Sequence, residues 1–217
     1  MSANQFGTVS IIGVGLIGAS LGLALKQAKV VHQMIGVGRS AANLDQALKM
    51  GAIDRVADLA DAVRSSQWIV VCVPVAQMRA IFTQMEPHLG PNTLITDAGS
   101  TKCDVILAAK ETLGKKVCQF VPAHPIAGGA QHGAAAARAD LFQDKQTIIC
   151  QLQENSVADV ALAEQFWMTV GSKIKRISAV QHDAIYAAVS HLPHILSYAL
   201  MASVLNSEDA EQKLGHA

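Results

Sequence analysis

His124 is the residue that type and context best suit to moving a proton. It follows an apolar run and opens the glycine-rich stretch "HPIAGG" (residues 124–129). Imidazole has its ordinary pKa near neutrality, so histidine is the side chain best able to accept or donate a proton there. Position alone leaves a catalytic and a structural role for His124 equally open.

A glycine loop near the N-terminus has the spacing of a phosphate-binding turn. The sequence "GVGLIG" lies between a predicted strand and a predicted helix. The first glycine permits a tight turn, the second lets the backbone approach a pyrophosphate, and the third lets helix and strand pack closely. The start of the helix adds free N–H groups and the positive end of its dipole. We expect the phosphates to contact Gly13, Gly15, Leu16, Ile17 and Gly18.

The end of the second predicted strand indicates which dinucleotide binds. Sites for NAD usually place Asp or Glu there to bind the ribose hydroxyls. Here the strand ends with Gly38, followed by Arg39 and Ser40. The missing acid removes repulsion toward a 2′-phosphate, and Arg39 offers a bidentate cation for it. The sequence favours NADP over NAD, although Arg39 could also be a solvated loop residue beside an NAD site.

Two further strand ends fall on the edge where open α/β sheets bind ligands. Pro74 stops the first strand, as a cofactor-flanking residue or as a simple terminator. Ser100, in "DAGSTK", could donate a hydrogen bond to a substrate or the nicotinamide, or cap the following helix. The predicted cofactor contacts here are Cys72, Val73, Pro74 and Gly99.

Short apolar runs alternate with amphipathic stretches along most of the chain. Strands are predicted at 8–15, 32–38, 68–74, 93–100, 119–125, 146–152 and 172–177, and helices at 16–27, 41–51, 76–89, 101–113 and 157–171. This alternation indicates an α/β fold, Rossmann-like, with a doubly wound, mainly parallel sheet. We expect a dinucleotide-binding domain over 1–178 and the beginning of an all-helical domain over 179–217, with Pro193 interrupting its helix.

The composition excludes several classes of partner. Of 217 residues, 51% are hydrophobic and 4% aromatic, and 17 Lys and Arg balance 17 Asp and Glu. Neither a nucleic acid nor a membrane is therefore expected as a partner. The four cysteines form no C-x-x-C pair, and the N-terminus has no signal peptide, which indicates a cytoplasmic protein with reduced thiols.

Taken in order, five motifs resemble the prephenate/arogenate dehydrogenase family of tyrosine biosynthesis. They are "GVGLIGASLGLAL", "VCVPV", "DAGSTK", "HPIAGG" and "SHLPH". The resemblance implies a Rossmann domain joined to a helical dimerisation domain, and hence a homodimer formed through the C-terminal helices. It also implies oxidation of prephenate or arogenate with NAD or NADP, losing carbon dioxide as the ring becomes aromatic.

The resemblance also implies roles for individual residues. His124 accepts the proton of the substrate hydroxyl, and Ser100 positions the histidine, that hydroxyl and the nicotinamide. His194 reaches the substrate from the helical domain, with His191 supporting it. Alternatively, His191 and His194 are helix-end residues flanking Pro193. A zinc site is not expected, because no further ligands are spaced nearby.

Two departures from the family pattern concern the substrate. The loop "GGAQHG" (residues 128–133) lacks the glutamate of many prephenate-specific relatives. Gly129 and Gln131 of this loop are predicted to contact the substrate, without deciding between prephenate and arogenate. The family's carboxylate-binding arginine would fall beyond residue 217, so the chain is expected to be a fragment that binds cofactor better than it turns over substrate.

Two other functions remain open from the sequence. A β-hydroxyacid dehydrogenase also carries a glycine loop and a D-x-G-S stretch, but it relies on a helical lysine where this chain has His182, His191 and His194. A non-catalytic NADP-binding module would need the glycine loop but not His124.

Overall fold

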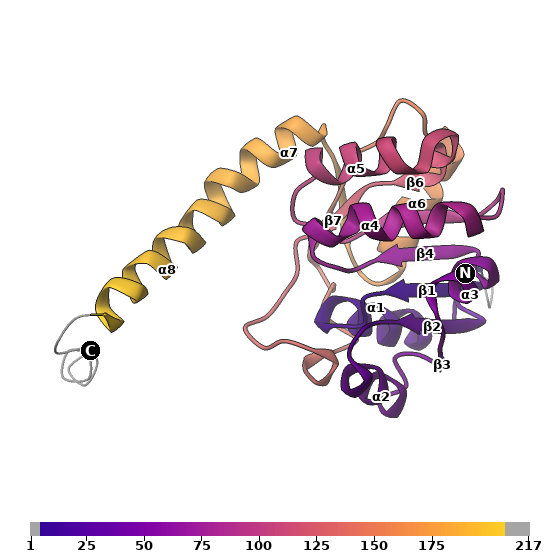
Figure 1. Cartoon of the computed structure of the whole chain (residues 1–217), viewed down its shortest axis with the longest axis horizontal. Coiled ribbons are helices and arrows are strands. Elements are labelled where there is room, and N and C mark those ends of the chain that lie inside the picture. The colour runs from indigo at the N-terminus through magenta and orange to yellow at the C-terminus, as the bar shows by residue number, and fades with distance from the viewer. Residues whose placement is uncertain (1–4, 207–217) are drawn as a thin grey trace.

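A parallel six-stranded sheet forms the centre of the molecule (Figure 1). The computed structural model describes residues 5–206. The strand order is β3-β2-β1-β4-β5-β6, and every neighbouring pair in this sheet is parallel. The strands are β1 (Thr8–Ile12), β2 (Gln33–Val37), β3 (Arg55–Val56), β4 (Trp68–Val71), β5 (Leu94–Asp97) and β6 (Phe120–Val121). This arrangement confirms the predicted doubly wound α/β fold.

Helices cover both faces of this sheet, and each face has its own core. Ile11 belongs to the cluster that includes side chains of α1, α2 and α6, whereas Ile12 belongs to the cluster of α3, α4 and α5. Successive residues of a strand point to opposite faces, so a continuous apolar strand feeds both cores. The helices are α1 (Leu16–Gln27), α2 (Ala41–Lys49), α3 (Leu59–Ser65), α4 (Val75–Met85), α5 (Cys103–Leu113) and α6 (Val157–Thr169), with short 3₁₀ turns at Glu86–His88, Gly114–Gln119 and Ala134–Ala136.

A second, three-stranded sheet corrects one predicted strand. The run 119–125 is not one strand: it divides at Pro122 into β6 of the large sheet and β7 (Ala123–Pro125) of the small one. The small sheet has the order β7-β8-β9, with β8 (Gln146–Ile149) antiparallel to β7 and β9 (Lys173–Arg176) parallel to β8. Proline has no N–H to continue a ladder, so the chain can change sheets there.

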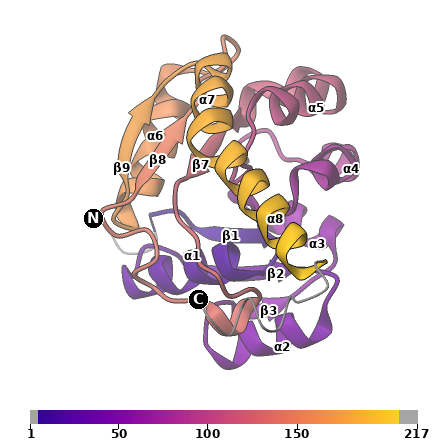
Figure 2. The same cartoon turned by 90° about the vertical axis from the view of Figure 1, so that its left-hand side faces the viewer.

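The last described segment is one long helix that extends away from the sheets (Figures 1 and 2). It consists of α7 (Ala179–Tyr186), a π turn over Ala187–His191 and α8 (Leu192–Leu205). The expectation that Pro193 interrupts the helix is wrong. Pro193 lies in the first turn of α8, directly after the π turn. A π turn changes the hydrogen-bonding step, and it accommodates a proline without ending the helix.

This helix exposes many apolar side chains. Those at least 60% exposed are Val180, Val189, Ile195, Leu196, Tyr198 and Leu200. Among residues 5–206, Ala179–Leu205 is also the one helix long and apolar enough to cross a membrane by length and composition, a weak indication for a single helix. Apolar surface of this extent is normally covered by another molecule.

Candidate functional site

The three glycines of the first turn have the geometry that a dinucleotide needs. Gly13 has φ +99°, and a Cβ there would lie 2.6 Å from the carbonyl oxygen of Cys72. A Cβ on Gly18 would lie 2.5 Å from the Gly13 oxygen, whereas one on Gly15 would meet nothing within 4 Å. Gly13 and Gly18 are thus required by the turn and by close packing. Gly15 leaves open space before α1, whose N-terminus no side chain caps.

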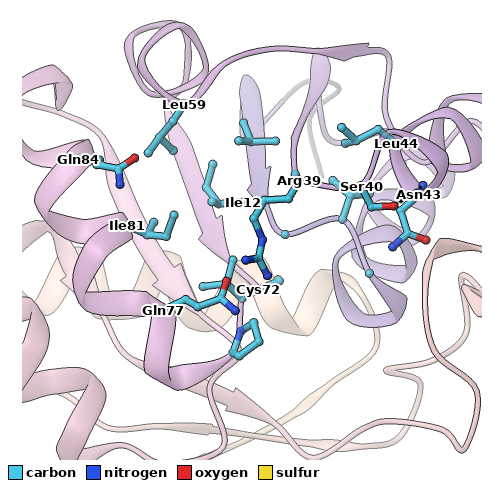
Figure 3. Close-up of a pocket in the computed structure, with 17 residues that line it drawn as sticks. Ile12, Arg39, Ser40, Asn43, Leu44, Leu59, Cys72, Gln77, Ile81 and Gln84 are labelled. Atoms are coloured by element: carbon cyan, nitrogen blue, oxygen red, sulfur yellow. Dashed lines mark hydrogen bonds between the residues drawn. The ribbon is translucent and has the colours of Figure 1, made fainter.

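A cavity of about 510 Å³ opens beside this turn (Figure 3). The turn after β2 forms one wall, where Arg39 reaches across toward Gln77 of α4. The Ser40 hydroxyl accepts a hydrogen bond from the backbone N–H of Asn43 at 3.3 Å and so caps α2. The lining residues are Ile12, Gly13, Val14, Gly15, Val37, Gly38, Arg39, Ser40, Asn43, Leu44, Leu59, Cys72, Val73, Pro74, Gln77, Ile81 and Gln84.

The charge of this cavity comes from one side chain. Within the described chain, the lining contains Arg39 and no carboxylate. A site with a single cation and no acid suits the adenosine end of a dinucleotide that carries a 2′-phosphate. The residues present therefore fit a nicotinamide dinucleotide.

Four residues predicted to contact the cofactor lie outside the cavity lining: Leu16, Ile17, Gly18 and Gly99. Leu16 and Ile17 stand at the start of α1 and pack partly against the core. Gly99 is buried, and its N–H donates to Asp97 Oδ2 at 2.8 Å. Their predicted cofactor contacts stay predictions.

His124 is the first member of a hydrogen-bonded chain that the sequence did not predict. Its Nδ1 lies 2.8 Å from Nε2 of His182. The Nδ1 of His182 lies 2.7 Å from Oδ1 of Asp183. His182 is fully buried, and His124 is half-buried. Strand β7 supplies the first residue and α7 the other two, so the chain joins the small sheet to the long helix.

The direction of this chain follows from the carboxylate at its end. Asp183 accepts hydrogen bonds from the backbone N–H groups of Lys102 and Cys103, at 2.7 and 2.8 Å. An ionised carboxylate only accepts, so Nδ1–H of His182 donates to it, and Nε2 of His182 accepts from Nδ1–H of His124. The Nε2 of His124 then carries the lone pair, and it has no protein partner among residues 5–206. The arrangement prepares His124 as a proton acceptor.

The electrostatics keep both imidazoles neutral. Burial, together with the Lys102 ammonium and the neighbouring His182 and His191, lowers the pKa of His124 from 6.5 to about 3. Burial also lowers the pKa of His182. Burial raises the pKa of Asp183, but hydrogen bonds from the backbone N–H groups of Lys102 and Cys103 outweigh it and bring the value to about 2.

Ser100 lies in the segment between β5 and α5. Its side chain is exposed, and it has no hydrogen bond within the described residues. The first amides of α5 are satisfied by Asp183, so the interpretation of Ser100 as the helix cap is wrong. Its predicted role toward substrate stays a prediction.

The other predicted substrate residues differ in their exposure. His191 is half-buried and close enough to influence the pKa of His124, whereas His194 is exposed on α8. Gly129 and Gln131 are exposed in the loop after β7, and a Cβ on Gly129 would lie 3.5 Å from a Leu16 methyl. The interpretation of His191 and His194 as helix-end residues is wrong, because the helix continues through both.

Sequence reasoning missed the residues that support His124. His182 and Asp183 lie 58 and 59 positions further along, and no local pattern links them to it. Tyr186 was missed as well: its ring centroid lies 5.4 Å from that of His124 and 4.7 Å from that of His182. Of the residues that support His124, Lys102 alone stands in a short motif, as the charged residue of "DAGSTK". No group of three or more His, Cys, Asp or Glu that could hold a metal occurs among residues 5–206.

Comparison with known proteins matches most of the chain to one family. The family model for the nucleotide-binding domain of prephenate dehydrogenase matches residues 21–176, and that for its dimerization domain matches residues 178–216. A cyclohexadienyl dehydrogenase of Zymomonas mobilis subsp. mobilis is 34% identical over 206 residues, which cover 94% of this chain and 69% of the relative. A prephenate dehydrogenase of Bacillus subtilis is 32% identical, and the match covers 93% of this chain but 55% of that relative.

Solved structures of the same family resemble this chain. The chain is similar to prephenate dehydrogenase from A. aeolicus in complex with hydroxyphenyl propionate and NAD+, with a TM-score of 0.87 and 26% identity over 94% of this chain and 71% of that one. It is also similar to Synechocystis arogenate dehydrogenase, with a TM-score of 0.79 and 26% identity over 97% and 74%.

The doubly wound parallel sheet and its first glycine turn define a dinucleotide-binding domain. With both family models matched along its length, the chain belongs to the prephenate dehydrogenase family. The family match gives no support to the β-hydroxyacid dehydrogenase alternative.

Proposed function

We propose that this chain is the catalytic and cofactor-binding part of an NADP-preferring dehydrogenase that oxidises and decarboxylates prephenate, arogenate or both. The products are 4-hydroxyphenylpyruvate from prephenate and tyrosine from arogenate. The single observation that carries the proposal is the hydrogen-bonded chain from His124 through His182 to Asp183, which leaves Nε2 of His124 free. A proton acceptor fixed in this way is what oxidation of an alcohol requires.

In this proposal, one group of residues transfers the proton and another orients the substrate. Nε2 of His124 accepts the proton of the substrate hydroxyl as carbonyl character develops at that carbon. His182 and Asp183 keep the acceptor in the right tautomer, and the Asp183 carboxylate stabilises the imidazolium that forms. The nicotinamide, when bound, takes up the hydride from the same carbon. Ser100, His191 and His194 are proposed to orient the substrate, together with Gly129 and Gln131.

Arg39 supports the proposed preference for NADP. Its guanidinium lies in a cavity that lacks carboxylates, so a 2′-phosphate meets a cation and no repulsion. The A. aeolicus relative was solved with NAD+. The preference is therefore a property of this chain's own residues 38–40, not one transferred from that relative.

We also propose that the enzyme is a cytoplasmic homodimer, with residues 1–178 as the dinucleotide-binding domain and 179–217 as the beginning of the dimerisation domain. The exposed apolar side chains of α7 and α8 coincide with the matched dimerization model. A second copy covering this face would remove them from water, so a membrane is not needed to account for the long apolar helix.

The direct test is the rate of reduced-nicotinamide formation with each substrate and each cofactor. Prephenate and arogenate are each supplied with NADP and with NAD, and absorbance of the reduced nicotinamide is followed. We expect turnover with at least one substrate and a higher kcat/KM for NADP than for NAD. A higher kcat/KM for NAD would contradict the cofactor assignment. Cofactor binding without turnover on either substrate would leave the non-catalytic module as the better account.

A further inference from the structure

A fully buried ion pair contacts the residue that precedes His124. The side chains of Asp97 and Lys102 both have 0% exposure, and Lys102 Nζ donates to Asp97 Oδ2 at 2.5 Å. Burying two charges costs free energy that their attraction repays only when the remaining polar atoms are also satisfied. Gly99 N–H donates to the same carboxylate oxygen, so the pair is part of a larger network.

The remaining hydrogen bonds of this pair go to one residue, Ala123. Lys102 Nζ donates to its carbonyl oxygen at 2.6 Å, and its N–H donates to Asp97 Oδ1 at 2.9 Å. On the other edge of β7, Pro122 and Ile126 make their hydrogen bonds with Cys150 and Gln146. The ion pair therefore takes the place of a neighbouring strand along the free edge of β7, at the position before His124.

The backbone of Lys102 holds the opposite end of the histidine chain. Its N–H donates to Asp183 Oδ1 at 2.7 Å, and that same oxygen is 2.7 Å from His182 Nδ1. One residue thus fixes the strand that carries His124 through its side chain and the carboxylate that orients His182 through its backbone.

We propose that Lys102 is a positioning residue for His124: its side chain fixes β7 and its backbone fixes Asp183, so it sets the place and the tautomer of the imidazole between them. The importance of this role for turnover rests on the proposed function of His124 as proton acceptor. The state of the imidazole itself does not depend on that function.

Lys102 also places a positive charge near the imidazole of His124. An ammonium beside an imidazole disfavours a second positive charge, and Lys102 is the largest charged contribution that lowers the pKa of His124. His182 and His191 act in the same direction, and Asp183 acts in the opposite one. Removing the ammonium should let His124 take up a proton at higher pH.

The experiment is a pH titration of the histidine ring nitrogens by ¹⁵N NMR in the whole protein, with His124→Gln used for assignment. The variants are Lys102→Met and the charge-balanced pair Asp97→Asn/Lys102→Met. Lys110→Met is the matched control, since Lys110 is also on α5 but forms a half-exposed pair with Glu154. We expect both Lys102 variants to raise the titration midpoint of His124 by about one pH unit or more, and Lys110→Met to leave it unchanged.

Each outcome decides the proposal. An unchanged His124 midpoint and tautomer in the folded variants would overturn it. Lys102→Met leaves Asp97 buried without its cation, so it could unfold, but the double variant buries no charge there. If the double variant fails to fold, as followed by circular dichroism, the pair serves folding alone and the proposal is also overturned. The titration needs no substrate, so it distinguishes a failure of this inference from a failure of the proposed dehydrogenase activity.

Discussion

The cofactor cavity and the histidine chain are built by different means. The cavity is open, and one strand–loop–helix turn with the next strand end supplies its glycines and its single charge, Arg39. The histidine chain and the buried Asp97–Lys102 pair beside it are largely closed, and their residues come from β5, β7, α7 and the segment before α5. Substitutions in an open site cost little folding free energy. In a closed polar network, each side chain is held by its hydrogen bonds to the others, so replacing one disturbs them all.

The sharpest way to test what burial adds is to break one buried charge pair and one exposed charge pair. Asp97→Asn leaves the Lys102 ammonium buried without its counter-ion, which should lower the free energy of unfolding by about 3–5 kcal/mol. Chemical denaturation measures this loss. Arg79→Gln breaks an ion pair with Glu111 that is about half exposed. This variant should leave the denaturation midpoint nearly unchanged. Equal losses of unfolding free energy in the two variants would show that the buried ion pair contributes no more to stability than an exposed one.

Asp183→Asn tests the histidine chain itself. An amide can present N–H to His182, which favours the wrong imidazole tautomer and turns the hydrogen-bond direction around. We expect kcat to fall by about 10²- to 10⁴-fold, while cofactor affinity is kept. Steady-state rates and a fluorescence titration with cofactor measure the two effects. A normal kcat would contradict the assigned direction of the chain.

The pH dependence distinguishes the histidine chain from a solvated histidine. His124 has a pKa of about 3 in the folded protein, so it remains a proton acceptor well below the ordinary value of 6.5. The acid limb of kcat/KM should therefore lie well below pH 6.5. The unfolded chain takes up a proton on this residue near pH 6.5 and the folded one does not, so the free energy of unfolding should fall as the pH drops below 6.5. An acid limb at 6.5 in both the wild type and Lys102→Met would contradict the charge argument.

Arg39→Gln tests the open cavity, where the smallest effect is expected. It should lower the ratio of kcat/KM for NADP to that for NAD by about tenfold, with no change in thermal stability. Arg64→Gln is the control, because Arg64 is a surface arginine outside the cavity lining. An unchanged ratio for Arg39→Gln would remove the basis for NADP preference.

The same contrast explains what could be predicted from the sequence. Helix α1 was predicted with its observed bounds, Leu16–Gln27, because its apolar spacing and glycine loop are local signals. The two-residue strand β3 and the seven-residue helix α3 were missed, since neither is long enough to show a period. Pro122 gave no sign that the chain changes sheets there, because a proline also ends or bends a single strand.

The candidate site follows the same rule. His124 and Arg39 stand in short motifs that can be recognised along the chain. The roles of Lys102, His182 and Asp183 depend on contacts between residues up to 81 positions apart, which no spacing encodes. Burial also decides their chemistry, and burial of a polar side chain is a property of the folded protein.

The most direct measurement of the central claim is turnover and cofactor affinity of His124→Asn compared with the wild type. If the cavity binds the cofactor and the histidine chain accepts the proton, kcat should fall by about 10²- to 10⁴-fold, with the dissociation constant for NADP unchanged. Wild-type turnover in this variant, with either prephenate or arogenate, would contradict the account.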